Sequence, residues 1–279
     1  MLCYNGHMPD LSYPDLLLLK LGGSLITDKT TPRTPRLDVI ARLAGEIKTV
    51  KSTNRDWKIV LGHGSGSFGH VLAKQYGTRR GVDSADDWRG FSEVWYEAAA
   101  LNRIVMDALH HAGLPAISFP PSGAVTAKDG KVANWNLAPL ISALDAGLLP
   151  VVFGDVVFDQ VRGGTILSTE DIFSNLARRL LPKRILLAGI EQGVWDDFPA
   201  CTHLISEINA ENWKAVAAGL GDSAATDVTG GMLGKVRAML DLVQKIPELE
   251  VIIFGGDQSG NLSAAMEGEP LGTRITRNR

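Results

Sequence analysis

The stretch that decides the fold is LLLLKLGGS, residues 16–24. Its apolar part, residues 16–21, is typical of a parallel strand buried on both faces. Five further runs have the same character, and helical periodicity fills the intervals between them. The runs are 58–61, 115–119, 149–153, 184–188 and 250–254, and the helical stretches are 37–50, 88–111, 136–146, 171–180, 208–220 and 232–244. Strands that alternate with helices predict a doubly wound α/β sheet.

Two segments break this alternation. Residues 125–133, around Lys128-Asp129-Gly130, and residues 156–166, around Arg162-Gly163-Gly164, carry the turn residues of β-hairpins. We therefore expect two hairpins inserted into the α/β fold.

Composition narrows the function classes. The chain has 279 residues, 45% of them hydrophobic, and a net charge of −3, which gives no reason to expect a nucleic-acid partner. No apolar run is long enough to cross a bilayer, so we expect no membrane partner. Cys3 and Cys201 show no metal or redox spacing. Residues 1–15 read as an N-terminal extension without the pattern of a signal peptide, which makes the cytoplasm the expected location.

The first motif with chemical content is Lys20-Leu21-Gly22-Gly23-Ser24, where the first strand ends, with Lys29 shortly after it. Glycines without Cβ atoms let backbone N–H groups converge on a phosphate, and the lysines supply positive charge. The pattern differs from the Walker P-loop. It indicates an anion site of another type.

The second motif is GHGSGSFGH, residues 62–70, directly after the second strand. So many glycines and serines bury little surface, but they suit a loop around a phosphate. His70, at the end of this loop, is expected to bind a phosphate monoester, whereas His63 is expected to be structural.

Two more segments complete the set. Asp227-Val228-Thr229-Gly230-Gly231-Met232, followed by Lys235, predicts a second phosphate site at a helix start. Asp155 follows another strand, and Ser168-Thr169-Glu170-Asp171 has the pattern of a helix cap. Together the motifs indicate a kinase that binds a nucleotide and an anionic acceptor and transfers a phosphoryl group between them.

In order and spacing, these motifs resemble the amino acid kinase superfamily, and the Ser-Phe-Gly-His ending of the second loop resembles its isopentenyl phosphate kinase branch. The resemblance implies a three-layer αβα sandwich around a mainly parallel central sheet, with β-hairpin insertions. It implies one domain over 16–279, in which 16–180 binds the acceptor and 181–279 the nucleotide. The expected reaction is ATP-dependent phosphorylation of isopentenyl phosphate to isopentenyl diphosphate, a step of isoprenoid precursor synthesis, by a homodimer.

The resemblance also assigns roles to residues. Lys29 stabilises the transition state, and Lys20, His70 and Asp155 join it in catalysis. No residue is expected to bind metal directly, because Mg²⁺ is held mainly through phosphates. The acceptor is bound by Ser65, Gly66, His70 and Thr169, and the nucleotide by Lys20, Gly22, Gly23, Ser24, Gly66, Ile190, Gly193, Gly230 and Lys235. Two departures stand out: Ile190 occupies the place of an expected acidic residue, and Thr169-Glu170-Asp171 replaces Gly-Asp-Asp.

Alternatives remain at this level. A kinase for a phosphonate such as fosfomycin presents a similar anionic head to His70. A nucleotide-binding sensor or storage protein without turnover would account for the altered Ile190 segment. We expect the alkenyl chain to need an apolar pocket, partly lined by the stripe Phe91, Val94, Trp95, Ala98 and Ile104.

Overall fold

The computed structural model describes residue 13 and residues 15–220 and 231–278. The N-terminal extension (except residues 13 and 15) and residues 227–230 of the third motif lie outside this part of the chain. The elements run in the following order. They are β1 (Leu16–Leu21), α1 (Gly23–Ile26), α2 (Leu37–Thr53), β2 (Lys58–His63), α3 (Gly66–Tyr76), α4 (Ala85–His111), β3 (Ala116–Ser118), η1 (Pro121–Gly123), β4 (Val125–Lys128), β5 (Lys131–Trp135), α5 (Ala138–Asp145), β6 (Leu149–Phe153), β7 (Asp155–Asp159), β8 (Gly163–Leu167), α6 (Thr169–Leu180), β9 (Arg184–Gly189), β10 (Val194–Trp195), β11 (Leu204–Ile205), β12 (Glu207–Ile208), α7 (Trp213–Gly219), α8 (Gly231–Lys245), β13 (Glu250–Gly255), α9 (Asn261–Glu267) and β14 (Thr273–Ile275).

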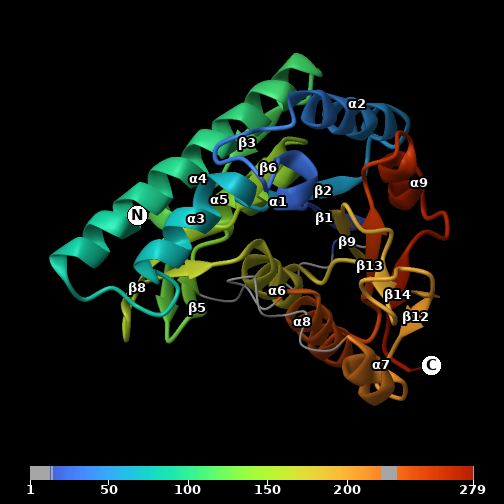
Figure 1. Cartoon of the computed structure of the whole chain (residues 1–279). Helices are drawn as coiled ribbons and strands as arrows, with labels where there is room; N and C mark the ends of the chain where they lie inside the picture. Colours follow the sequence, from blue (N-terminus) through green and yellow to red (C-terminus); the bar gives the residue numbers. More distant parts are fainter. Residues whose placement is uncertain (1–12, 14, 221–230, 279) are drawn as a thin grey trace, which may run out of the picture.

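Eight strands form the central sheet, in the order β12-β14-β13-β9-β1-β2-β6-β3. All neighbours are parallel except β13 and β14. Helices α1, α2, α4 and α9 cover one face, and α5, α6 and α8 cover the other (Figure 1). The three-layer αβα sandwich and the mainly parallel sheet are therefore confirmed.

The first strand shows why its sequence is continuously apolar. Leu16 and Leu18 pack into the core on the α6 and α8 side, whereas Leu17, Leu19 and Leu21 pack on the α2 and α4 side. A strand at the centre of a parallel sheet is covered on both faces, so neither face can be polar. Lys20 interrupts this pattern where the strand ends, on the same side as α6 and α8.

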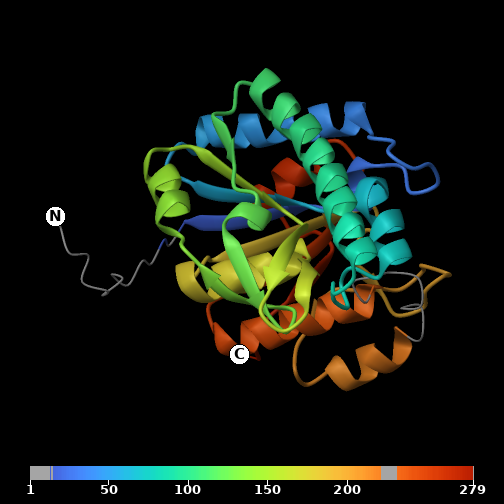
Figure 2. The ribbon, with the colours of Figure 1, turned by 90° about the vertical axis from the view of Figure 1, so that its left-hand side faces the viewer.

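Both predicted hairpins are present, as β4–β5 and β7–β8. They pair with each other through β4 and β7 and so form a second sheet, in the order β5-β4-β7-β8. Figure 2 shows this sheet beside the long helix α4. The sequence indicated the hairpins but not their pairing, which joins segments about thirty residues apart (Thr126 and Phe158).

Two predicted segments differ from the structure in the kind of element that they contain. Residues 62–70 were expected to be a loop, but α3 begins inside them at Gly66, because Phe68 and Ala73 give this segment a buried apolar face. Residues 208–220 were expected to be one helix, but Ile208 pairs with β14. The side chains of Asn209 and Asn212 then form turns with nearby backbone N–H groups, so α7 begins only at Trp213.

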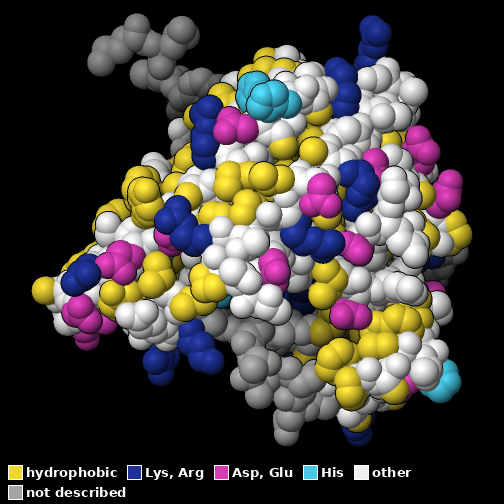
Figure 3. Space-filling view, turned by 45° about the horizontal axis from the view of Figure 1, so that its top comes forward, with side chains coloured by type: hydrophobic (Ala, Val, Ile, Leu, Met, Phe, Trp, Pro, Cys, Tyr) yellow, Lys and Arg dark blue, Asp and Glu magenta, His cyan; other side chains and the backbone are white. Residues whose placement is uncertain are grey.

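Within the described residues, no helix combines the length and hydrophobicity needed to span a bilayer. On the face seen in Figure 3, Lys and Arg side chains lie among Asp and Glu side chains and form no continuous basic patch.

Candidate active site

Two cavities meet where the parallel strands β1, β2, β6 and β9 end. The α4-side cavity, of about 140 Å³, reaches from the glycine loops to Val94 and Ala98 of α4. The α8-side cavity, of about 270 Å³, reaches from the first glycine loop, at Gly22 and Ser24, to Met232 of α8. The residues that line both are Lys20, Gly22, Ser24, Lys29, Gly189 and Lys235. Three lysines therefore stand at the boundary, which is where a group passed between two ligands would lie.

The two glycine loops touch each other through their backbones. A Cβ atom on Gly23 would lie 2.4 Å from the Gly66 nitrogen, and one on Gly64 would lie 2.8 Å from the Gly23 nitrogen. Thr27 joins the loops, since its hydroxyl donates to the Gly23 carbonyl (2.7 Å) and accepts from the Ser67 N–H (2.9 Å). Side chains at these glycines would push the loops apart. The sequence therefore fixes the spacing of the two anion-binding segments.

Glu170, whose position after Ser168-Thr169 predicts a place in a helix cap, also forms an ion pair with Lys20 at 2.5 Å. Burial by itself raises the pKa of this carboxyl, but the charges of Lys20 and Lys235 dominate and lower the pKa to about 2. An ionised carboxylate between two lysines sets their positions at the cavity boundary. The predicted cap is also present: Ser168 is the N-cap of α6, and Asp171 accepts from its N–H and its hydroxyl.

Ser65, His70 and Thr169 line the α4-side cavity, as predicted for an acceptor site. His70 lies in the second turn of α3, and α6 begins at Thr169, so the positive end of a helix dipole faces the cavity. The Thr169 hydroxyl is already used, because it donates to the His63 carbonyl at 2.7 Å. Gly66 is the one predicted site residue within the described chain that lines neither cavity.

His63 lies behind the second glycine loop and is fully buried. Its Nδ1 donates to the Gly64 carbonyl (3.1 Å), and its Nε2 accepts from the Asn102 side chain (3.1 Å). Burial, with the Lys20 charge adding to it, lowers the pKa of this imidazole to about 4. A neutral ring thus supports the loop, in agreement with the structural role expected from sequence.

Asp155, predicted to be catalytic, lines the α4-side cavity but is 1% exposed. Its carboxylate accepts from the backbone N–H groups of Ser122 (3.0 Å) and Val156 (2.9 Å). Burial raises its pKa to about 6. Through these contacts Asp155 holds η1 against β7, and this structural role is independent of the predicted catalytic one.

The apolar part of the α4-side cavity consists of Ala73, Val94, Ala98 and Ile166, and Arg79, which is paired with Asp171, lines the same cavity. Two residues of the predicted stripe, Val94 and Ala98, are among them. Phe91 packs beside Val94, whereas Trp95 is 44% exposed. The cavity therefore has a polar, cationic end and an apolar end.

The α8-side cavity contains Ile190 and Gly193, the two residues predicted there from the β9 segment. The acidic residue that was missing at position 190 is present one residue later, since Glu191 also lines this cavity and accepts from the indole N–H of Trp195 (3.1 Å). Trp195 and Phe198 add aromatic surface. Gly230, also predicted here, lies outside the described residues.

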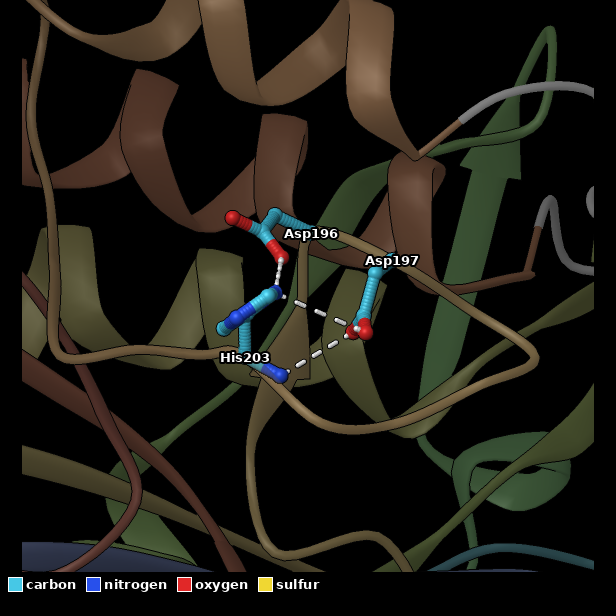
Figure 4. Close-up of side chains that lie close together, drawn as sticks. All are labelled: Asp196, Asp197 and His203. Carbon is cyan, nitrogen blue, oxygen red and sulfur yellow. Dashed lines mark hydrogen bonds and ion pairs between the residues drawn. The ribbon is translucent and has the colours of Figure 1, made fainter.

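One group in the described chain has the composition of a metal site. Asp196, Asp197 and His203 lie together in the loop between β10 and β11, with ligand atoms within 4.8 Å of one another (Figure 4). The Asp197 carboxylate accepts from the N–H groups of Thr202 and His203, which accounts for the arrangement as a loop closure. The cluster is not part of either cavity.

Comparison with known proteins identifies the family of this chain. The amino acid kinase family matches residues 15–255, so the chain belongs to that family. Within it, several relatives of this chain are isopentenyl phosphate kinases. Those of Methanothermobacter thermautotrophicus and Methanocaldococcus jannaschii are 34% and 33% identical to it, over 94% and 93% of this chain and 99% and 98% of theirs. The isopentenyl phosphate kinase of Arabidopsis thaliana is 34% identical over 64% of this chain.

Solved structures agree with the sequence relatives. An X-ray structure of an isopentenyl phosphate kinase superposes with a TM-score of 0.80 at 30% identity, covering 94% of this chain and all of the other. A product complex of the Thermoplasma acidophilum isopentenyl phosphate kinase superposes with a TM-score of 0.75 at 25% identity.

Proposed function

We propose that this protein transfers the γ-phosphoryl group of ATP to isopentenyl phosphate and so forms isopentenyl diphosphate. The observation that carries the proposal is the pair of cavities that share three lysines, one of them with an apolar part. A donor and an acceptor bound in these cavities would place their phosphates on either side of Lys29.

The α4-side cavity suits the acceptor. His70 and the Ser65 backbone would bind its phosphate, with the start of α6 at Thr169 on the other side. Ala73, Val94, Ala98 and Ile166 would contact the five-carbon tail. Burial of such a tail contributes about 0.8 kcal/mol for each CH₂ group.

The α8-side cavity suits the nucleotide. Lys20, Gly22, Gly23 and Ser24 would bind the β- and γ-phosphates, Lys235 would neutralise them, and the cavity near Ile190 and Gly193 would take the nucleoside. Glu170 would keep Lys20 and Lys235 in place. The acceptor would thus bind to the half 16–180 and the nucleoside to the half 181–279, while residues 20–24 of the first half would hold the phosphates of the nucleotide.

Transfer requires no covalent enzyme intermediate. An oxygen of the acceptor phosphate attacks the γ-phosphorus, the new P–O bond forms as the bond to the bridging oxygen breaks, and ADP leaves with the electron pair. The attacking phosphate is already anionic, so no general base is needed. Lys29 would neutralise charge on the phosphoryl group in flight, and alignment with charge neutralisation accounts for catalysis.

Mg²⁺ would supply further charge neutralisation on the phosphates when it is bound. The carboxylates that line the two cavities in the described chain, Asp155, Glu170 and Glu191, each already hold an N–H or ammonium group. The residues therefore fit an ion held mainly through the phosphates.

The apolar part of the α4-side cavity favours an alkenyl phosphate over a small polar phosphonate such as fosfomycin. A sensor or storage protein is disfavoured for a different reason. Three lysines at the boundary between two cavities serve the transfer of a phosphoryl group, and a protein that only binds nucleotide does not need them.

The direct test is a coupled ADP-release assay with isopentenyl phosphate, fosfomycin, short alkyl phosphates and acetylglutamate as acceptors. We expect isopentenyl phosphate to give the highest kcat/KM. Failure to phosphorylate any alkenyl phosphate would refute the proposal.

Lys29→Ala should lower kcat by on the order of a hundredfold, with ATP binding largely retained, because charge neutralisation in the transition state is lost. Lys74→Ala, which removes an exposed lysine of α3, is the matched control. Equal kcat in Lys29→Ala and wild type would disprove the role of Lys29.

We also propose that the protein is a cytoplasmic homodimer. The family resemblance supports this, and the outermost strand β3 carries Ile117 with 40% of its surface exposed. Light scattering after gel filtration measures the mass, and a monomer at micromolar concentration would argue against the dimer.

A further inference from the structure

The loop between α1 and α2, residues 27–36, carries Lys29 and is here named the Lys29 loop. Its two ends are joined: Thr27 and Pro35 form a β-bridge, and the Asp28 N–H donates to the Thr34 carbonyl (2.9 Å). Lys29 itself is exposed at the tip and lines both cavities. These contacts hold only the ends of the Lys29 loop, and without others the tip could tilt.

Arg33 attaches the other side of this loop to α3 and α4. Its N–H donates to the Ser67 carbonyl (3.2 Å), and its guanidinium lies 6.0 Å from the ring centroid of Phe68 and 5.9 Å from that of Tyr96. Its Nε lies 3.1 Å from Oε2 of Glu97. One side chain therefore contacts both helices that form the acceptor side of the site.

The contact with Arg33 accounts for a carboxylate at position 97 of α4. It is 8% exposed, and its neighbours Val94, Ala98 and Leu101 are buried apolar residues. Its Oε2 is buried and accepts no hydrogen bond of good geometry from the described residues, so Arg33 provides its charge compensation. A buried carboxylate without such a partner would be strongly unfavourable.

The backbone conformation of Arg33 also indicates that its side-chain contacts matter. Its φ is +53°, in the left-handed region that glycine or asparagine adopts more easily. An arginine in this conformation has a strained backbone, and the contacts of its side chain offset the cost of that strain.

We propose that Arg33 and Glu97 are a positioning pair for Lys29. The ion pair fixes the Lys29 loop to α4, in the same helical turn whose Val94 and Ala98 line the acceptor cavity. Lys29 is thereby held at a set distance from the acceptor's phosphate. This inference rests on the proposed function, in which Lys29 acts on the phosphoryl group in flight.

The test measures kcat and KM for Arg33→Ala, Glu97→Gln and the double variant, each also in the Lys29→Ala background. We expect kcat to fall about ten- to hundredfold in each single variant, because small displacements of a catalytic group carry large costs. The KM for ATP should stay within about twofold of the wild-type value. The double variant should be no worse than the singles, and neither substitution should lower kcat further once Lys29 is alanine.

Arg33→Lys, which keeps the charge, should recover part of the lost activity. Arg103→Ala removes the exposed Arg103–Asp107 pair on the same helix and should leave kcat unchanged. Arg33 is half exposed, so Arg33→Ala still decides the question if Glu97→Gln does not fold. Unchanged kcat in Arg33→Ala, or an equal further loss in the Lys29→Ala background, would overturn the inference.

Hydrogen exchange followed by mass spectrometry gives a readout that needs no acceptor. Amides of the Lys29 loop should exchange faster in Arg33→Ala and Glu97→Gln than in wild type, and unchanged exchange would count against the pair. If the loop responds but wild type does not phosphorylate isopentenyl phosphate, the proposed function fails and the anchoring of the loop stands.

Discussion

His70 lines the α4-side cavity and is the side chain proposed to bind the phosphate of the acceptor. Replacing it by alanine removes a donor, whereas glutamine keeps one at similar reach. We expect His70→Ala to raise the KM for isopentenyl phosphate by about tenfold or more, and His70→Gln to be milder, since a hydrogen bond to a charged group contributes ~1.5–3 kcal/mol. Initial rates at varied acceptor concentration measure this.

The control is His111→Ala, at the exposed end of α4. If both His70 variants match the wild-type KM, His70 does not bind the acceptor.

His63 predicts how stability responds to acid. The pKa of its imidazole is lowered from 6.5 to about 4 by burial, with Lys20 adding to the effect, so the unfolded chain takes up this proton at higher pH than the folded one. Its contribution is present above pH 6.5 and is lost as the pH falls toward 4. Over the whole window this amounts to about 3 kcal/mol of unfolding free energy at most.

Urea unfolding at pH 7 and pH 5 tests this point. His63→Gln should weaken the loss of unfolding free energy between these pH values, whereas His203→Gln, at an exposed histidine, should not. The same pH dependence in His63→Gln and wild type would contradict the assignment.

At the scale of elements, two glycines in helices are predicted to behave in opposite ways. A Cβ on Gly45, within α2, would meet no atom within 4 Å. Gly66 begins α3 with φ +49°, and a Cβ there would lie 2.1 Å from Thr27 Oγ1. Gly45→Ala should raise Tm by roughly 1–3 °C without changing kcat, because alanine loses less entropy in a helix.

Gly66→Ala should lower both Tm and kcat, since it separates the second glycine loop from the first. Differential scanning calorimetry and the coupled assay give both numbers. A neutral Gly66→Ala would show that the contact between the loops is dispensable.

The elements also show how far sequence reasoning reaches. Strands β1 and β6 have the predicted bounds, because burial on both faces of a parallel sheet leaves a continuous apolar run. The short strands β12 and β14 and the pairing of β4 with β7 were missed, since they depend on partners distant in sequence.

The same holds for the site: sequence reveals the residues whose signal is local and misses those that depend on a distant partner. Lys20, Lys29 and His70 were recognisable from glycine-rich surroundings. Glu170 was not, because it follows Ser-Thr as a capping acid would, and its partner Lys20 is 150 residues away.

For the whole molecule, the arrangement of the cavities predicts a sequential kinetic mechanism, in which both substrates bind before either product leaves. Because both cavities open onto the same three lysines, donor and acceptor are bound together before transfer. Initial-rate plots against ATP at several acceptor concentrations should give intersecting lines, and no phosphorylated protein should accumulate with ATP alone. Parallel lines with a labelled protein in mass spectrometry would indicate a covalent intermediate instead.

The interlocked glycine loops and the apolar turn of α4 have a consequence for how such enzymes diversify. In the proposed arrangement, the reactive head of the acceptor would meet backbone and lysines held by the central sheet, whereas its tail would meet a few side chains that project from helices α3 and α4 and from strand β8. Exchanging those side chains would retune which alcohol-derived phosphates are accepted without disturbing the chemistry. In this fold, the residues that would select the tail of the acceptor can therefore change independently of the residues that would transfer the phosphoryl group.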